Sequence, residues 1–179
     1  MINLDESVLN FFKLFFNQQI ALIFFYFYFF FYFFLLIYVL YLYFFERNYK
    51  KFKRFSVLIL IGFIVINTLK YTVGRERPTS FLKKEDYSFP SSHAYFSTLL
   101  FLFSPSNLFG LITKLYSILT ILSTLYIPLH YFSDVIFSIV LAIVFNSLFQ
   151  QDFLEKVERK LREIVKKVIL KRKIVLKKL

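Results

Sequence analysis

Long runs of uncharged residues alternate with short polar stretches along the chain. The longest run extends from Ile20 to Phe45 and has 26 residues. At 1.5 Å per residue such a helix is about 39 Å long, which exceeds a hydrocarbon core of about 30 Å. Four further apolar runs cover 55–73, 92–104, 108–129 and 131–149. We therefore expect an all-α membrane bundle of about five transmembrane helices, in which the short run 92–104 begins below the membrane surface.

Both ends of the chain have an amphipathic pattern instead of a continuous apolar one. Residues 2–17 mix apolar side chains with Asp5, Glu6 and Lys13, and the segment is too short to span a bilayer. The tail 152–179 repeats apolar residues at helical spacing among eleven Lys and Arg. These patterns predict an interfacial helix at each end, with the basic tail on anionic lipids.

Composition and charge support a membrane protein with a defined orientation. Apolar residues make up 58% of the chain, yet its net charge is +12. Basic flanks of membrane helices face the cytoplasm, which places the predicted loop 47–54 and the tail inside and the loop 74–91 outside. This explains the charge better than a nucleic-acid partner, and we expect none. The chain contains no Cys, which excludes disulfides and thiolate metal sites. We expect one domain over 1–179.

The chain has two histidines, His93 and His130, and both fall at the predicted outer face. Asp134 follows His130 by four residues, a spacing that places both side chains on one helix face. A carboxylate bonded to one imidazole nitrogen fixes the tautomer and makes the other nitrogen a better nucleophile or base. The alternative is an interfacial histidine with satisfied bonds and an Asp134 that caps the helix.

Cations and a helix start lie at the same predicted face. Lys70, Arg75 and Arg77 are close in sequence, and guanidinium groups match phosphate oxygens bidentately. Ser91 and Ser92 precede an apolar run, and the N–H groups that begin a helix form an anion site. Each feature alone fits membrane anchors or an ordinary helix cap. Together with the two histidines they predict phosphoryl transfer through a histidine nucleophile.

Three sequence blocks resemble the signature of the phosphatidic acid phosphatase type 2 family, membrane lipid phosphate phosphatases related to vanadium haloperoxidases. The blocks lie within residues 70–134: Lys70 with Arg77-Pro78, then Pro90-Ser91-Ser92-His93, then Ser123 with His130 and Asp134. The resemblance implies a site that needs no metal and no cofactor. It implies that His130 attacks phosphorus, that Asp134 orients it, and that His93 protonates the leaving oxygen and then activates water. Lys70, Arg77 and the amides around Ser91 and Ser92 would hold the phosphate.

One position departs from the family pattern. The family has Arg after the serine of the third block, and this chain has Thr124. We expect Arg75 to replace the missing phosphate ligand. The alternative is that Arg75 pairs with Glu76, Glu85 or Asp86, or faces lipid head groups.

The resulting hypothesis is a lipid phosphate phosphatase at the periplasmic face of a bacterial inner membrane. A lipid A 1-phosphatase is the first expectation, and undecaprenyl diphosphate phosphatase and phosphatidylglycerophosphate phosphatase are the alternatives. A hypothesis of another class is a non-catalytic membrane protein that binds anionic lipid or carries a solute. A binder would need the cations, but not a His–Asp pair together with a second histidine.

Overall fold

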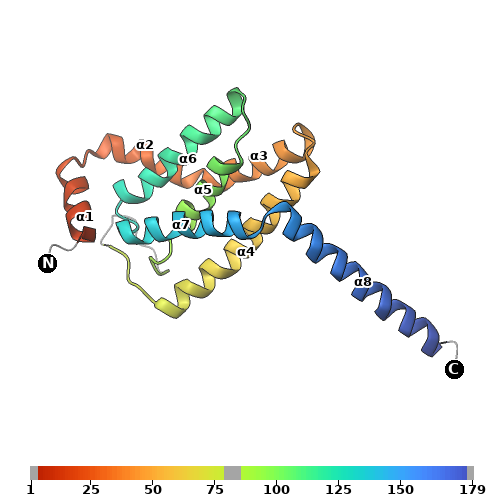
Figure 1. The fold of residues 1–179 in the computed structure, drawn as a ribbon. Helices are drawn as coiled ribbons and strands as arrows, with labels where there is room; N and C mark the ends of the chain where they lie inside the picture. Colours follow the sequence, from red (N-terminus) through yellow and green to blue (C-terminus); the bar gives the residue numbers. More distant parts are fainter. Residues whose placement is uncertain (1–3, 79–85, 177–179) are drawn as a thin grey trace.

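The computed structural model describes residues 4–78 and 86–176, and these residues form α-helices joined by short connections (Figure 1). The all-α prediction is thus confirmed for the described part. The helices are α1 (Leu4–Leu14), α2 (Gln18–Phe29), α3 (Phe31–Phe44), α4 (Tyr49–Val73), α5 (Ser92–Phe103), α6 (Leu108–Tyr126), α7 (Phe132–Leu148) and α8 (Gln151–Leu176).

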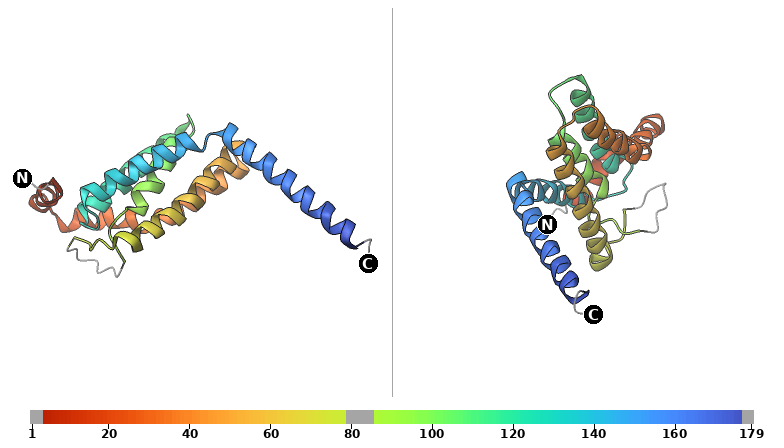
Figure 2. Two further views of the ribbon diagram at one scale, coloured as in Figure 1. Left: turned by 60° about the horizontal axis from the view of Figure 1, so that its bottom comes forward. Right: turned by 90° about the vertical axis from the view of Figure 1, so that its right-hand side faces the viewer.

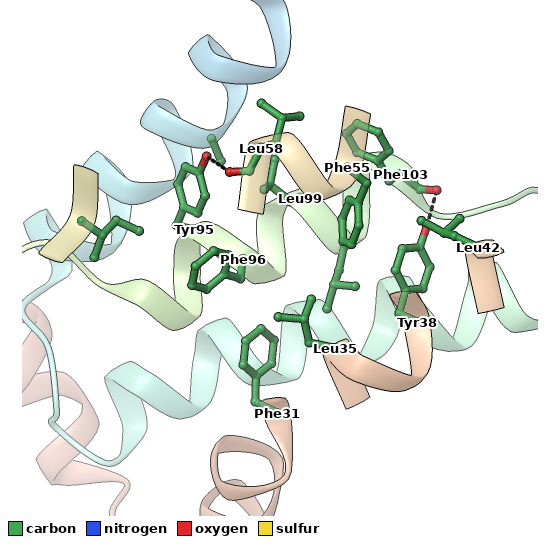
Figure 3. Close-up of a cluster of buried hydrophobic side chains, with 13 residues drawn as sticks. Phe31, Leu35, Tyr38, Leu42, Phe55, Leu58, Tyr95, Phe96, Leu99 and Phe103 are labelled. Carbon is green, nitrogen blue, oxygen red and sulfur yellow. Dashed lines mark hydrogen bonds between the residues drawn. The ribbon is translucent and has the colours of Figure 1, made fainter. Parts of the chain in front are cut away.

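The short helix α5 forms the centre of the bundle and contacts α3, α4, α6 and α7. Nine of its 12 residues are buried. Figure 3 shows its side chains packed among those of α3 and α4, and Tyr95 Oη of α5 donates to the Leu58 carbonyl at 3.1 Å. Because neighbouring helices surround it, α5 does not need the length of a helix that faces lipid on its own.

The first long apolar run forms two helices, and the prediction of a single helix over 20–45 was wrong. The chain breaks at Phe30, and α2 and α3 meet at a bend of 43°. No Pro or Gly lies in this segment. Instead, three rings beside the break surround His93: those of Tyr28, Phe31 and Tyr32, with centroids 4.0, 5.0 and 5.1 Å from the imidazole. The bend accompanies the packing of both half-helices against one side chain.

The basic stretch 47–54 was predicted to be a loop, but most of it is helical. Helix α4 begins at Tyr49, and the Asn48 side chain caps it by accepting from the Lys51 amide at 3.1 Å. Arg54 donates to the carbonyls of Asn146 at 2.5 Å and Phe149 at 3.0 Å. The cation thus caps the C-terminal end of α7, where free carbonyls carry partial negative charge.

Within the described residues, α4 and α6 are each long and apolar enough to cross a membrane. The number rises to four when each of two bent pairs, α2 with α3 and α7 with the first part of α8, counts as one span. Helix α5 is apolar but has only 12 residues, so length alone does not identify it as a span. The described part of the chain therefore has two to four candidate spans by length and composition, which is fewer than the predicted five.

The two terminal helices lie at opposite ends of the molecule (Figure 2). Helix α8 covers most of the basic tail, which was predicted to be helical; it extends away from the bundle, and residues 161–166 are exposed (Figure 1). Near its start, Glu155 pairs with Lys50 of α4 at 2.9 Å, and Glu158 pairs with Lys53. Helix α1, which was expected from the amphipathic pattern, packs on α6 and α7.

Candidate active site

The first motif lies where α4 ends and the chain reverses. Lys70 is in the last turn of α4, and the Gly74 amide donates to the Lys70 carbonyl at 3.0 Å. Gly74 has φ 62°, a left-handed conformation that glycine adopts without steric cost. The chain after Gly74 turns toward the connection between α6 and α7, so that Arg77 Nη1 donates to the Leu129 carbonyl at 2.7 Å.

Lys70 and Arg77 converge on one carboxylate, that of Asp86. Arg77 Nε and Nη2 contact Asp86 Oδ1 at 3.0 and 2.7 Å, and Lys70 Nζ lies 3.4 Å from Asp86 Oδ2. The side chains of Lys70 and Arg77 are only 8% and 9% exposed, whereas that of Asp86 is 46% exposed. Two nearly buried cations thus form an anion site that an accessible carboxylate fills.

The contacts of His130 assign its tautomer. Its Nε2 lies 3.2 Å from Arg77 Nη1, and its Nδ1 lies 2.7 Å from the Ser88 carbonyl oxygen. An arginine only donates and a carbonyl only accepts, so Nε2 carries the lone pair and Nδ1 carries the proton. The imidazole therefore presents an unprotonated nitrogen beside the guanidinium of Arg77.

The surroundings of His130 keep it neutral. The residue is fully buried in the connection between α6 and α7, outside both helices. Burial lowers the pKa of its imidazole from 6.5 to about 4, Arg77 and Lys70 act in the same direction, and Asp134 opposes them. At neutral pH the ring is thus uncharged, which is the form that a nitrogen nucleophile requires.

Asp134 has three partners around its carboxylate. Its Oδ1 accepts from Arg75 Nη1 at 2.6 Å, and its Oδ2 accepts from the Tyr131 amide at 3.0 Å. The same Oδ2 lies 3.8 Å from His130 Nδ1, within ion-pair range but beyond a hydrogen bond. His130 and Asp134 are thus close, as predicted. The alternative, that Asp134 caps α7, also applies, because Asp134 accepts from the Tyr131 amide.

Arg75 contacts neither the cations predicted to bind phosphate nor the partners that were expected for it. Arg75 binds Asp134 at 2.6 Å and Asp5 at 2.7 Å, not Glu76 or Asp86, and Glu85 lies outside the described residues. Thr124 Oγ1 donates within its own helix to the Ile121 carbonyl at 2.8 Å. The guanidinium of Arg75 is thus directed to the far side of Asp134, not to the anion site of Lys70 and Arg77.

The second motif starts α5 as predicted. Ser91 Oγ caps the helix by accepting from the Ala94 amide at 3.4 Å. The Ser91 amide, which was expected to face the phosphate, donates to Ser138 Oγ at 2.8 Å. Ser92 is the first residue of α5, and its amide has no acceptor within the helix. This amide is the one that remains to face a phosphate.

His93 lies at the same end of the bundle as His130. Its ring stacks on Tyr28 at 4.0 Å with an interplanar angle of 21°. Tyr28 packs in turn against Ile127 and Leu129, which belong to the connection that carries His130. The structure thus brings the three sequence blocks to one end of the bundle, as the alternation of the predicted spans indicated.

Sequence reasoning missed two groups of this site. One is the Ser88 carbonyl on His130 Nδ1; a backbone acceptor leaves no signal in the residue type. The other is the Asp86 carboxylate between Lys70 and Arg77. Asp86 was considered only as a partner of Arg75, although an acidic residue in a loop next to two cations is a visible signal.

The family model of the PAP2 superfamily matches residues 51–157, which contain the three motif blocks. The chain belongs to the PAP2 superfamily. Its enzyme class is therefore that of a PAP2 phosphatase, a hydrolase of lipid phosphates from a metal-independent family. This confirms the predicted enzyme class and argues against the non-catalytic binder.

A solved structure has a similar fold. It is described as the first transmembrane PAP2 type phosphatidylglycerolphosphate phosphatase from Bacillus subtilis, and the TM-score with this PAP2 chain is 0.68. The two are 17% identical, and the match covers 86% of this chain and 85% of the other. No curated protein sequence matches the chain. The structural similarity agrees with a multi-pass membrane protein of the same architecture.

Proposed function

We propose that this PAP2 phosphatase removes phosphate from a membrane lipid through a phosphohistidine on His130. The observation that supports this most directly is the neutral imidazole whose Nε2 lies 3.2 Å from Arg77 Nη1. Arg77 and Lys70 already bind the carboxylate of Asp86. A phosphate group can take its place, because it offers these cations more oxygen acceptors than a carboxylate does. The guanidinium of Arg77 thus contacts both the anion site and His130. This arrangement suits attack of His130 on the phosphorus of a bound phosphate.

In the first step, His130 Nε2 forms a bond to phosphorus while the bond from phosphorus to the lipid oxygen breaks. The leaving oxygen takes a proton from His93. Lys70, Arg77 and the Ser92 amide hold the non-bridging oxygens as charge redistributes among them. The phosphorylated imidazole keeps its Nδ1 proton and becomes cationic; the Ser88 carbonyl at 2.7 Å and the Asp134 carboxylate at 3.8 Å stabilise this charge.

In the second step, water attacks phosphorus and His93 takes its proton. The bond between phosphorus and Nε2 breaks, so that inorganic phosphate leaves and His130 returns to its neutral form. Asp86 lies where the phosphate binds in this scheme, and each cycle therefore requires that substrate displace the carboxylate from Lys70 and Arg77. The cost of that exchange limits affinity but makes release of phosphate easier.

The substrate class is a phosphomonoester or diphosphate of a lipid, as the family implies. The anion site does not select a head group, because it would contact only the phosphate. Among head groups, the sequence analysis put lipid A 1-phosphate first and undecaprenyl diphosphate among the alternatives. The architectural similarity to a phosphatidylglycerolphosphate phosphatase supports phosphatidylglycerophosphate as the first lipid to test. The acyl or prenyl chains would lie between the Phe- and Tyr-rich helices.

We predict that purified protein releases phosphate from at least one of these three lipids in detergent with excess chelator. Lys70 and Arg77 neutralise the phosphoryl charge, so chelation should change the rate by less than about twofold. The measurement is phosphate release from each lipid, with and without chelator and added magnesium. Activity that disappears on chelation and returns with magnesium would mean that the site has been assigned wrongly.

The proposed topology has five crossings within one domain over 1–179. The α2–α3 pair, α4, α6 and α7 give four, and the buried helix α5 completes the bundle as the fifth. This places the motif end at the periplasmic face of a bacterial inner membrane and the basic residues of α4 and α8 on anionic lipids of the cytoplasmic face.

The absence of native cysteine allows a direct test of this topology. Tyr87 lies beside the site and is 37% exposed, and Tyr49 lies at the start of α4 and is 68% exposed. We expect Tyr87→Cys, but not Tyr49→Cys, to react with an impermeant thiol reagent in intact spheroplasts. Permeabilised cells provide the control, in which both variants should react. The reverse pattern would place catalysis in the cytoplasm.

A further inference from the structure

The catalytic carboxylate of the proposed site is linked to the N-terminal helix by a chain of charged groups. Asp134 is fully buried, and its Oδ1 accepts from Arg75 Nη1 at 2.6 Å. The other terminal nitrogen of Arg75, Nη2, donates to Asp5 Oδ2 at 2.7 Å. One guanidinium thus bridges a carboxylate of α1 and a carboxylate of α7, which lie 129 residues apart in the sequence (134 − 5).

The position of Arg75 is fixed from several sides. Its guanidinium lies 3.9 Å from the centroid of the Tyr131 ring, and its Nη1 also donates to Ser133 Oγ at 2.7 Å. Asp5 accepts in addition from the Ser133 amide at 2.8 Å and from Ser133 Oγ at 2.7 Å. Asp5 therefore does two things at once: it caps the start of α7 and holds the arginine against that start.

Helix α1 is itself held in place by a contact remote from these charges. Tyr126 Oη of α6 donates to the Phe15 carbonyl at 3.0 Å and accepts from the Asn17 amide at 2.9 Å. The outer face of α1 exposes large apolar side chains, as expected of a helix at a membrane surface. These side chains are Leu4, Phe11 and Leu14, and Phe15 directly after the helix is also exposed.

We propose that Asp5 is a positioning residue for catalysis and acts on His130 through Arg75 and Asp134. This inference rests on the proposed function. Asp5 and Asp134 together carry two negative charges against the one positive charge of Arg75, so this group of three keeps a net negative charge on the Nδ1 side of His130. That charge favours the cationic phosphohistidine. Without Asp5, the guanidinium pairs with Asp134 alone and cancels its charge.

This role predicts a specific kinetic signature. Asp5→Asn keeps the shape of the side chain but removes its charge, and kcat should fall about tenfold. KM should stay within about twofold, because Lys70 and Arg77 hold the phosphate. Asp5→Glu should restore much of the loss. Glu6→Gln is the matched control on the same helix, since Glu6 is exposed; it should behave as the wild type.

A double-mutant cycle separates positioning from a merely structural effect. If Asp5 acts through Asp134, Asp5→Asn should have little further effect in an Asp134→Asn background. The rate of phosphoenzyme formation, measured by rapid quench, gives the readout where turnover is slow. A wild-type kcat for Asp5→Asn, or a full tenfold loss that persists in the Asp134→Asn background, would overturn the inference.

The same experiments distinguish failure of this inference from failure of the proposed function. His130→Ala is assayed beside the Asp5 variants. If it is inactive while Asp5→Asn is normal, only the role of Asp5 is wrong. If His130→Ala retains turnover, the phosphohistidine mechanism itself fails. Thermal unfolding of each variant in detergent checks that α1 still packs on the bundle. Early unfolding of Asp5→Asn, together with an equally low activity of Asp5→Glu, would also count against positioning.

Discussion

Replacement of His130 by alanine is expected to reduce phosphate release by at least about 10³-fold, because the variant has no group that can form the covalent intermediate. The measurement is turnover of a lipid phosphate, together with acid-quench trapping of labelled phosphate on the protein. Wild-type protein should carry label on His130, and His93→Ala should lose turnover while it still forms some phosphoenzyme. His130→Gln, which retains more of the buried volume, controls for collapse of the site. Turnover by His130→Ala close to that of the wild type would rule out the mechanism.

The acid dependence of the same step gives a second readout of this prediction. The pKa of His130 is lowered to about 4, so its nucleophilic neutral form persists as pH falls through 6.5. Protonation should abolish attack only near pH 4. The rate of phosphoenzyme formation, followed in single turnovers as the pH is lowered from 8 to 4, should therefore show no loss on acidification that is centred near the ordinary histidine pKa of about 6.5.

Arg77→Lys is expected to lower kcat/KM by about two orders of magnitude although the charge is kept. The guanidinium of Arg77 contacts Asp86 through Nε and Nη2 and directs Nη1 to the Leu129 carbonyl and His130 Nε2. An ammonium group cannot make these contacts together. Loss of about two charge-assisted bonds at about 1.5 kcal/mol each gives this magnitude. The measurement is kcat/KM on the best lipid of the panel.

The matched variant for Arg77→Lys lies on the opposite side of the same ion pair. Asp86→Asn removes the carboxylate that competes for Lys70 and Arg77, and it should strengthen binding of inorganic phosphate or vanadate several-fold. Competitive inhibition constants measure this directly. An Arg77→Lys protein with normal kcat/KM, or an Asp86→Asn protein with weaker phosphate binding, would show that phosphate does not occupy the position of Asp86.

The sequence was sufficient to predict the helical fold and the end of the bundle where the motifs meet. Lys70, Ser91 and His130 each lie at or next to a helix end, and such positions can be recognised from local patterns. Contacts between distant segments had no such signal. Asp5 lies in a mixed terminal segment whose pattern indicates only an amphipathic helix, and its bond to Arg75 depends on the packing of α1 on α7.

Backbone geometry accounts for the remaining differences. The break at Phe30 occurs without Pro or Gly, beside aromatic rings that pack on His93, so no residue that disfavours helix marked it in the sequence. The Ser88 carbonyl owes its place on His130 to the path of the chain before α5. The helical start of α4 was missed because charge alone suggested a loop, whereas Asn48 supplies a cap.

The central burial of α5 affects how freely this fold can change its sequence over generations. Helix α6 exposes Leu111, Leu115, Ile118 and Leu122 on one side, and one apolar residue can replace another there without disturbing a neighbour. Helix α5 has almost no such side, because nine of its 12 residues are enclosed. Drift should therefore accumulate in lipid-facing stripes, while the enclosed helix preserves the spatial frame. Two chains can then diverge to 17% identity and keep one architecture.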